Sequence, residues 1–174
     1  MKLKSILGGA IALSLVSFGS YANGQGVVNF KGSVINAPCG IAPESIDQSI
    51  DFGQISKAHL NAGGTSVKKN LDIKLVNCDL TATNALTKGV KVNFSGTTLA
   101  GDTKTLGTAG DATGTGIVIY SQDGTQVDFV ADSAPQAIKP GDNTLHYNTW
   151  VVAPGKAAKE GAFTAVAHFN LAYE

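Results

Sequence analysis

The sequence predicts an all-β fold, either a sandwich or a barrel, and two observations indicate this class. Short apolar runs are separated by clusters rich in glycine and threonine, which are turn signals between short strands. Within several runs apolar and polar residues alternate, as on a strand with one face in a core. Residues 153–161 are expected to form a loop rather than a helix. Strands are predicted over residues 27–36, 48–55, 67–77, 89–95, 116–121, 126–131, 144–153 and 162–173.

The first 22 residues have the features of a signal peptide. Two lysines precede an apolar run over residues 6–18, and Ser20-Tyr21-Ala22 has the small residues that signal peptidase requires. The run is too short for a stable membrane span, although a retained anchor is the alternative. Cleavage before Asn23 leaves 152 residues, which suits one domain with its own core.

The charge of the predicted mature chain disfavours nucleic acid as a partner. Removal of the signal peptide leaves 11 lysines against 13 acidic residues, and the whole sequence contains no arginine. Proteins that bind nucleic acid usually carry a basic surface patch, often rich in arginine. We therefore expect no nucleic-acid binding.

Cys39 and Cys78 are the only cysteines. In an exported protein such a pair is expected to form a disulfide. The disulfide would close a loop of about 40 residues, which is worth about 4 kcal/mol in the chain-entropy model. A zinc site is the rival interpretation, but it needs two further ligands and no histidine lies close in sequence to either cysteine.

No motif predicts an enzyme, a cofactor or a metal site. The triplet Asp51-Phe52-Gly53 resembles a kinase metal-binding motif, but the other kinase motifs are absent. The glycines of residues 107–116 lack the Gly-Lys-Ser/Thr ending of a phosphate-binding loop and indicate a flexible loop. The histidines His59, His146 and His168 fall on different predicted elements and are expected to be solvated.

The two ends of the mature chain show complementary features. The last predicted strand is apolar and has no successor, which leaves an uncovered edge and groove. The predicted strand near the N-terminus has two glycines on its apolar face and would hold poorly to its own sheet. It is therefore expected to fill the gap in another copy of the molecule, where glycine permits close backbone approach. Its apolar face consists of Gly26, Val28, Phe30, Gly32 and Val34.

Several motifs together resemble the major pilins of the chaperone–usher family, most of all those of P-pilus rods. They are "GVVNFKGSVINAPC", "DQSIDFGQISK", "LDIKLVNCD", "LHYNTWVV" and "EGAFTAVAHFNLAYE". The last has a glycine fourteenth from the end, Gly161, and a penultimate tyrosine, Tyr173. The likeness spans essentially the whole mature chain.

The resemblance implies an incomplete immunoglobulin-like sandwich, the pilin fold, which lacks its last strand. Residues 1–22 would be the signal peptide, 23–35 the donor-strand extension and 36–174 the pilin domain. In such pilins a periplasmic chaperone lends a strand to the groove, and the extension of the next subunit replaces it at the outer-membrane usher. The groove and chaperone-facing residues would be Gly161, Phe163, Phe169, Leu171, Tyr173 and Glu174.

By the same resemblance the chain is expected to be the structural subunit of a cell-surface fimbria that supports adhesion. It would be exported through the periplasm, polymerise with identical subunits and meet tip or adaptor pilins. Two alternatives remain open, a minor or adaptor pilin and a monomeric secreted β-sandwich binding module. A self-complete fold would favour the binding module.

Overall fold

The computed structural model describes residues 26–81 and 89–174, and the predicted signal peptide lies outside these residues. The chain divides into an N-terminal segment that extends to Val34 and a compact unit, Ile35–Glu174. In its described part, the N-terminal segment has no regular secondary structure. No helix in the described ranges is long and apolar enough to cross a membrane.

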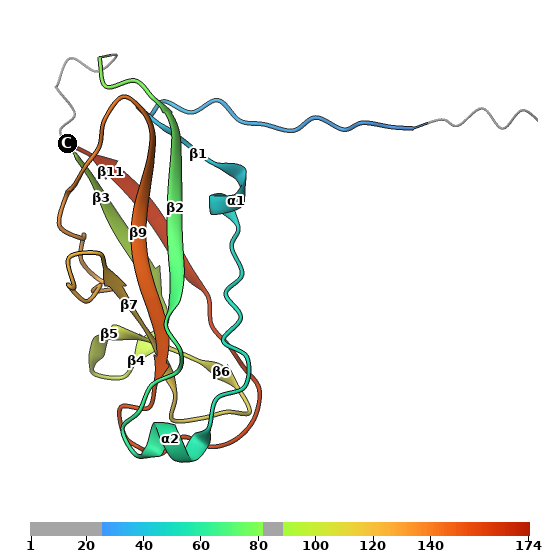
Figure 1. Cartoon of the computed structure of the whole chain (residues 1–174), viewed down its shortest axis with the longest axis vertical. Coiled ribbons are helices and arrows are strands. Elements are labelled where there is room, and N and C mark those ends of the chain that lie inside the picture. Colours follow the sequence, from blue (N-terminus) through green and yellow to red (C-terminus); the bar gives the residue numbers. More distant parts are fainter. Residues whose placement is uncertain (1–25, 82–88) are drawn as a thin grey trace, which may run out of the picture. The chain divides into compact units, whose positions relative to one another are not determined.

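The compact unit is built mainly from antiparallel strands, which confirms the all-β prediction (Figure 1). Its largest sheet has six strands in the order β1-β2-β9-β7-β5-β4. The long strands β2 and β9 are neighbours in this sheet, and Leu71 pairs with Tyr147 in their register. The bounds are β1 Gly40–Ile41, β2 Lys69–Cys78, β4 Thr98–Leu99, β5 Asp102–Gly107, β7 Gly116–Ser121 and β9 Gly141–Val152.

Two smaller sheets complete the strands of the compact unit. One has the order β11-β3-β8 and the other pairs β10 with β6. Two short helices, α1 (Pro43–Ile46) and α2 (Lys57–Asn61), lie in the stretch between β1 and β2 (Figure 1). The remaining strands are β3 Gly89–Gly96, β6 Ala109–Gly110, β8 Gln136–Ala137, β10 Phe163–Thr164 and β11 Ala167–Tyr173.

The core lies between the six-stranded sheet and the sheet that contains β3. Phe94 of β3 and Tyr147 of β9 meet edge to face, with ring centroids 5.0 Å apart. Alternate residues of each strand enter this core because successive side chains of a strand point to opposite faces. The predicted alternation therefore identified the core face correctly. Side chains that are almost completely buried there include Ile73, Leu75, Val90, Val92, Leu145 and Val151.

Cys39 and Cys78 form the predicted disulfide. Cys39 precedes β1 and Cys78 is the last residue of β2, and both are buried. Because β1 contains two residues, the disulfide fixes the start of the compact unit to the edge of β2 more firmly than so short a ladder could.

Two predicted strands are wrong in this structure. Residues 48–55 lie outside every strand, and 126–131 contribute only one isolated bridge, between Tyr120 and Gln126. Residues 128–131 instead form a turn in which the Asp128 carbonyl accepts a hydrogen bond from the Ala131 amide. Residues 27–36 have no ladder in the single chain, and their pairing with another copy stays a prediction. Alternation signals one buried face, but a strand also needs a neighbouring backbone to complete its hydrogen bonds.

The last predicted strand, 162–173, is divided into β10 and β11. β10 pairs with β6 and β11 pairs with β3, so the chain changes sheets at residues 165–166. Residues 153–161 form no helix, as predicted, whereas the predicted loop 107–116 contains the short strand β6.

Candidate groove between the 41–52 segment and the C-terminal strand

The apolar residues predicted to form a donor face are exposed in the N-terminal segment. Val28, Phe30 and Val34 have exposed fractions of 73%, 91% and 104%. Gly26 and Gly32 alternate with them, and a Cβ added at either glycine would meet no heavy atom within 4 Å. Exposed apolar side chains grouped in this way are typical of surfaces that bind a partner.

The strand β11 is apolar on its inner face but is not fully covered. Phe169, Leu171 and Tyr173 are half-buried and pack against the core, whereas Asn170 and Ala172 between them are exposed. Burial raises the pKa of the Tyr173 hydroxyl, because the phenolate loses hydration there. The inner face of β11 therefore contacts the core on one side and has space on the other.

Among the described residues, the backbone of β11 is paired along one edge only, because β11 is the outermost strand of its sheet. Gly89 and Glu174 exchange both backbone hydrogen bonds, at 3.1 Å each. In an antiparallel ladder such pairs alternate with pairs that are not hydrogen-bonded. The backbone groups of Tyr173, Leu171 and Phe169 consequently point away from β3, toward the open edge.

A groove of about 810 Å³ lies beside this edge. One wall, here called the 41–52 wall, consists of Ile41, residues 45–50 and Phe52, and the opposite wall consists of residues 163–169. Figure 1 shows the chain between α1 and α2 descending beside the start of β11. The floor consists of Leu71, Phe94, Leu106, Ile117, Ile119 and Thr149. An apolar floor beside free backbone groups is suited to an extended strand with alternating apolar side chains.

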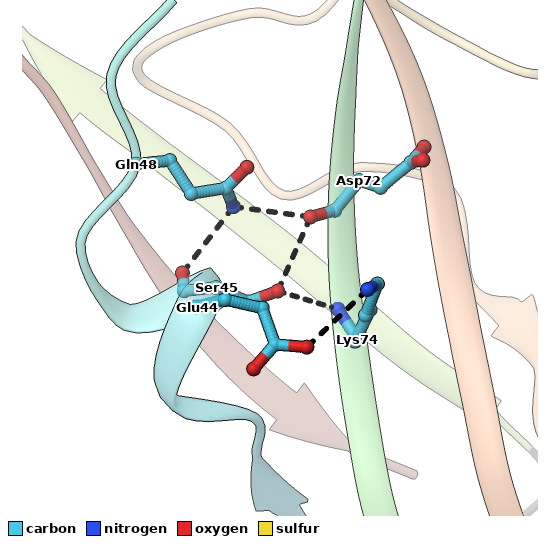
Figure 2. Close-up of polar contacts among 5 residues, drawn as sticks. All are labelled: Glu44, Ser45, Gln48, Asp72 and Lys74. Atoms are coloured by element: carbon cyan, nitrogen blue, oxygen red, sulfur yellow. Dashed lines mark hydrogen bonds and ion pairs between the residues drawn. The ribbon is translucent and has the colours of Figure 1, made fainter.

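The 41–52 wall is attached to β2 by side chains rather than by a continuous ladder (Figure 2). Ser45 accepts a hydrogen bond from the Lys74 amide at 3.0 Å and donates one to the Asp72 carbonyl at 3.3 Å. The Gln48 side-chain amide donates to the same carbonyl at 3.0 Å. Glu44 pairs with the Lys74 ammonium at 3.2 Å. Backbone hydrogen bonding of Glu44, and then the Lys74 contact, lower the pKa of the Glu44 carboxyl.

Of the predicted groove residues, Phe163 and Phe169 line the groove, whereas Leu171, Tyr173 and Glu174 lie outside its lining. The floor, the 41–52 wall and its polar attachment were not predicted from the sequence. Residues 48–55 were predicted to be a strand, and in that stretch Ile50 and Phe52 alternate with polar residues. Both side chains are half-buried and line the groove, so the alternation marks an inner face without a ladder. Proline at position 43, the first helical residue, was the available signal that the chain turns away from β2.

Gly161 and Phe163 have different roles among the predicted groove residues. Phe163 lines the groove, whereas Gly161 does not. Gly161 has a φ of +147°, and a Cβ there would lie 2.6 Å from the Ala112 amide nitrogen. The close approach accompanies a hydrogen bond from that amide to the Ala162 carbonyl. Gly161 thus sets the path of the chain into β10.

Glu174 is paired through both its backbone and its side chain. Its carboxylate forms an ion pair with Lys91, and this contact raises the pKa of the Lys91 ammonium. The predicted contact of its terminal carboxylate with a chaperone involves a partner and stays a prediction. His146 contacts the Asp72 carboxylate at 2.8 Å, and His168 lines the groove. Within residues 26–81 and 89–174 no group of three or more His, Cys, Asp or Glu could hold a metal.

The fold and groove define a class of protein, a β-sandwich with an apolar groove beside the outer edge of β11. Residues 28–174 match the family model described as fimbrial protein, and the chain belongs to that family. It is 45% identical to the Pap fimbrial major pilin protein of Escherichia coli, over 99% of this chain and 100% of the relative. It is 40% identical to the Fimbria A protein of Serratia marcescens, over the full length of both chains.

Two solved structures show the same fold. The crystal structure of the P pilus rod subunit PapA superposes with a TM-score of 0.73 at 45% identity, covering 79% of this chain and 100% of that chain. A chaperone–usher pilus structure described in relation to rod uncoiling superposes with a TM-score of 0.81 at 46% identity, covering 87% and 97%. The predicted pilin fold is therefore confirmed.

Proposed function

We propose that the chain is the major structural subunit of a bacterial surface fimbria and polymerises by strand donation. The groove beside β11 is the observation that carries this proposal, since its floor is apolar and its edge has free backbone groups. The donor is the N-terminal extension of the next subunit, and its apolar face consists of Gly26, Val28, Phe30, Gly32 and Val34. The groove face of the acceptor includes Phe163, Phe169, Leu171 and Tyr173.

The energetics of donation follow from the exposure of the extension. Val28, Phe30 and Val34 are largely exposed in the single chain, and burial of each would contribute roughly 1.5–3 kcal/mol. Backbone hydrogen bonds to β11 would supply affinity that is independent of side chains, and the alternating side chains would set the register. A contact in which each copy gives one strand and receives another is head-to-tail and does not close, so it extends a filament.

The proposed partners follow from the need to cover the groove before assembly. A free apolar edge aggregates, so a periplasmic chaperone would supply a temporary strand, as in the established example of strand addition to pilins. The outer-membrane usher would be the place of exchange, and tip or adaptor pilins would occupy the distal end of the fimbria. The near full-length likeness to major pilins favours a rod subunit over an adaptor.

A monomeric binding module is the competing function. It predicts a self-complete sandwich and gives the exposed apolar residues of the extension no role. The open edge of β11 and the exposure of Phe30 both favour strand donation.

The test compares the mature chain with a blocked chain that carries Phe30→Asp and Val34→Asp. We expect the mature chain to form linear polymers, seen by size-exclusion chromatography and electron microscopy. The blocked chain is expected to stay monomeric but to gain thermal stability when a peptide of residues 23–35 is added. The matched control carries Asn29→Asp and Ser33→Asp on the opposite face of the extension and should still polymerise. Strand donation would be refuted if the mature chain stayed monomeric and the peptide did not change the melting temperature of the blocked chain.

A further inference from the structure

We propose that Ser45 and Gln48 are positioning residues for strand uptake, because they hold the 41–52 wall at its distance from β11. The inference rests on the proposed function, since it concerns the same groove. It assigns to two polar side chains a role in the retention of the donor strand.

On the outer edge of β2, the Ser45 side chain makes hydrogen bonds that a neighbouring strand would otherwise make. The β1–β2 ladder contains two residue pairs, and the Ala42 amide makes the next backbone contact, to the Lys74 carbonyl at 2.9 Å. The chain then turns into α1, and the Ser45 hydroxyl bonds both the Lys74 amide and the Asp72 carbonyl. Ser45 has an exposed fraction of only 1%, so water cannot replace these contacts.

Gln48, three residues after Ser45, adds a further side-chain contact to β2. Its side-chain amide donates to the Asp72 carbonyl and, at 3.3 Å, to the Ser45 carbonyl (Figure 2). Both Ser45 and Gln48 line the groove. The attachment therefore lies at the groove itself rather than at a distant site.

The part of the wall beyond Gln48 has no comparable attachment. From residue 49 to the start of α2, the hydrogen bonds found in the described structure are local, such as Gly53 to the Asp51 carboxylate at 2.7 Å. Ile50 and Phe52, which supply part of the apolar surface of this wall, lie in that stretch. Phe52 also packs against the core, and the nearest hydrogen-bonded attachment of this stretch to β2 is the one at Ser45 and Gln48.

A preformed groove binds a strand more tightly than one that must be ordered during binding. Loss of the Ser45 hydroxyl would free the wall and deprive the Lys74 amide and the Asp72 carbonyl of that partner, while Gln48 still donates to the carbonyl. The bound strand would then escape faster, because one wall of the groove no longer holds its shape. A purely structural serine would lower the stability of the fold without changing strand release.

The chain offers a matched control in Ser66. Its hydroxyl accepts the Val151 amide at 2.9 Å and is 7% exposed, so it makes the same kind of buried contact with a strand. Ser66 does not line the groove. Ser66→Ala therefore removes an equivalent hydrogen bond away from the proposed site.

The experiment uses the mature blocked chain with a fluorescent peptide of residues 23–35 bound to it. Release of this peptide is followed after an excess of unlabelled peptide is added. We expect Ser45→Ala to release the peptide about tenfold faster, the effect of about 1.4 kcal/mol. Gln48→Ala should release it about threefold faster, since Gln48 is exposed and its loss leaves Ser45 in place. Ser66→Ala should release it at the unchanged rate, and Ser45→Thr, which keeps the hydroxyl, should restore slow release.

The outcomes separate this inference from the proposed function. If the blocked chain never binds the peptide, strand donation itself fails. If it binds, but Ser45→Ala and Gln48→Ala release the peptide no faster than Ser66→Ala, the positioning role is overturned while strand donation stands.

Discussion

Phe169 pairs directly with Phe94 across β11 and β3, and their ring centroids lie 6.3 Å apart, yet only Phe94 is buried. Phe94 has the ring of Tyr147 on its other side. Phe169 lies at the edge of the sheet and faces the groove. The contrast between the two paired phenylalanines shows that the inner face of β11 is less covered than that of β3.

We predict that Phe169→Ala weakens strand uptake more than it weakens the fold. Phe169 is half-buried, so the blocked chain alone should lose about 1–2 kcal/mol, less than the 3–5 kcal/mol of a fully buried phenylalanine. The rise in melting temperature on adding the peptide should fall by more than half. Val130→Ala, at a side chain 70% exposed and away from the groove, is the control and should change neither quantity. If Phe169→Ala lowered the stability of the chain equally with and without the peptide, Phe169 would not contact the bound strand.

Gly161→Ala is predicted to destabilise the chain by about 2–3 kcal/mol. The added Cβ would meet backbone atoms of Asp111 and Ala112 at 2.6–2.7 Å, and the φ of +147° disfavours any side chain. Denaturant unfolding measures the loss. Gly155→Ala is the matched control, because its Cβ would have open space, and we expect a change below about 0.5 kcal/mol. Equal stability of the two variants would show that the corner before β10 adapts to a side chain.

Reduction of the Cys39–Cys78 disulfide is predicted to cost about 4 kcal/mol of unfolding free energy, from the chain-entropy model for the 39-residue separation. The double substitution of both cysteines by serine should reproduce the loss. Denaturant unfolding of the blocked chain, with and without a reducing agent, measures it. An unchanged midpoint after verified reduction would show that β1 and the 41–52 wall hold the edge of β2 without the disulfide.

The chain is predicted to lose stability as the pH rises above 10.0. Burial raises the pKa of the Tyr147 hydroxyl above its ordinary value of 10.0, opposed in part by hydrogen bonds that include the one from Gln136. The unfolded tyrosine therefore ionises first, so its stabilising effect is complete below pH 10.0 and is lost as the pH passes through the folded pKa. Tyr173 has a pKa raised in the same direction.

Tyr147→Phe tests this assignment by removing the titrating group. The variant should be less stable by about 1 kcal/mol near neutral pH, because the hydrogen bond from Gln136 is lost. Its unfolding free energy should then fall less steeply between pH 9 and about pH 12 than that of the parent chain. If the unfolding free energies of the variant and the parent chain fell in parallel with pH, Tyr147 would not contribute to the loss of stability at alkaline pH.

The alternation of side chains predicted the core faces of β2, β3 and β9 because each of these strands has a ladder and one buried face. Residues 48–55 show the limit of that reasoning, since Ile50 and Phe52 face the groove without any strand partner. Periodicity reports burial on one side, whereas pairing depends on which backbone lies alongside.

The polar attachment of the 41–52 wall could not be predicted from the sequence. Ser45 and Gln48 are common surface residue types, and their partners Asp72 and Lys74 lie more than 20 residues away along the chain. Only the fold brings these backbone groups within reach of the two side chains. The N-terminal extension posed the opposite problem, because its strand pattern is clear but the single chain offers it no ladder.

Hydrogen exchange of the β11 amides tests strand donation most directly. In the blocked chain the amides of His168, Asn170 and Ala172 face β3 and should already exchange slowly. The amides of Phe169, Leu171 and Tyr173 face the open edge and should exchange fast. Addition of the peptide of residues 23–35 is predicted to slow this second set selectively, because a donated strand would bond to it. If the peptide left the exchange rates of the Phe169, Leu171 and Tyr173 amides unchanged, this would contradict the insertion of a strand beside β11.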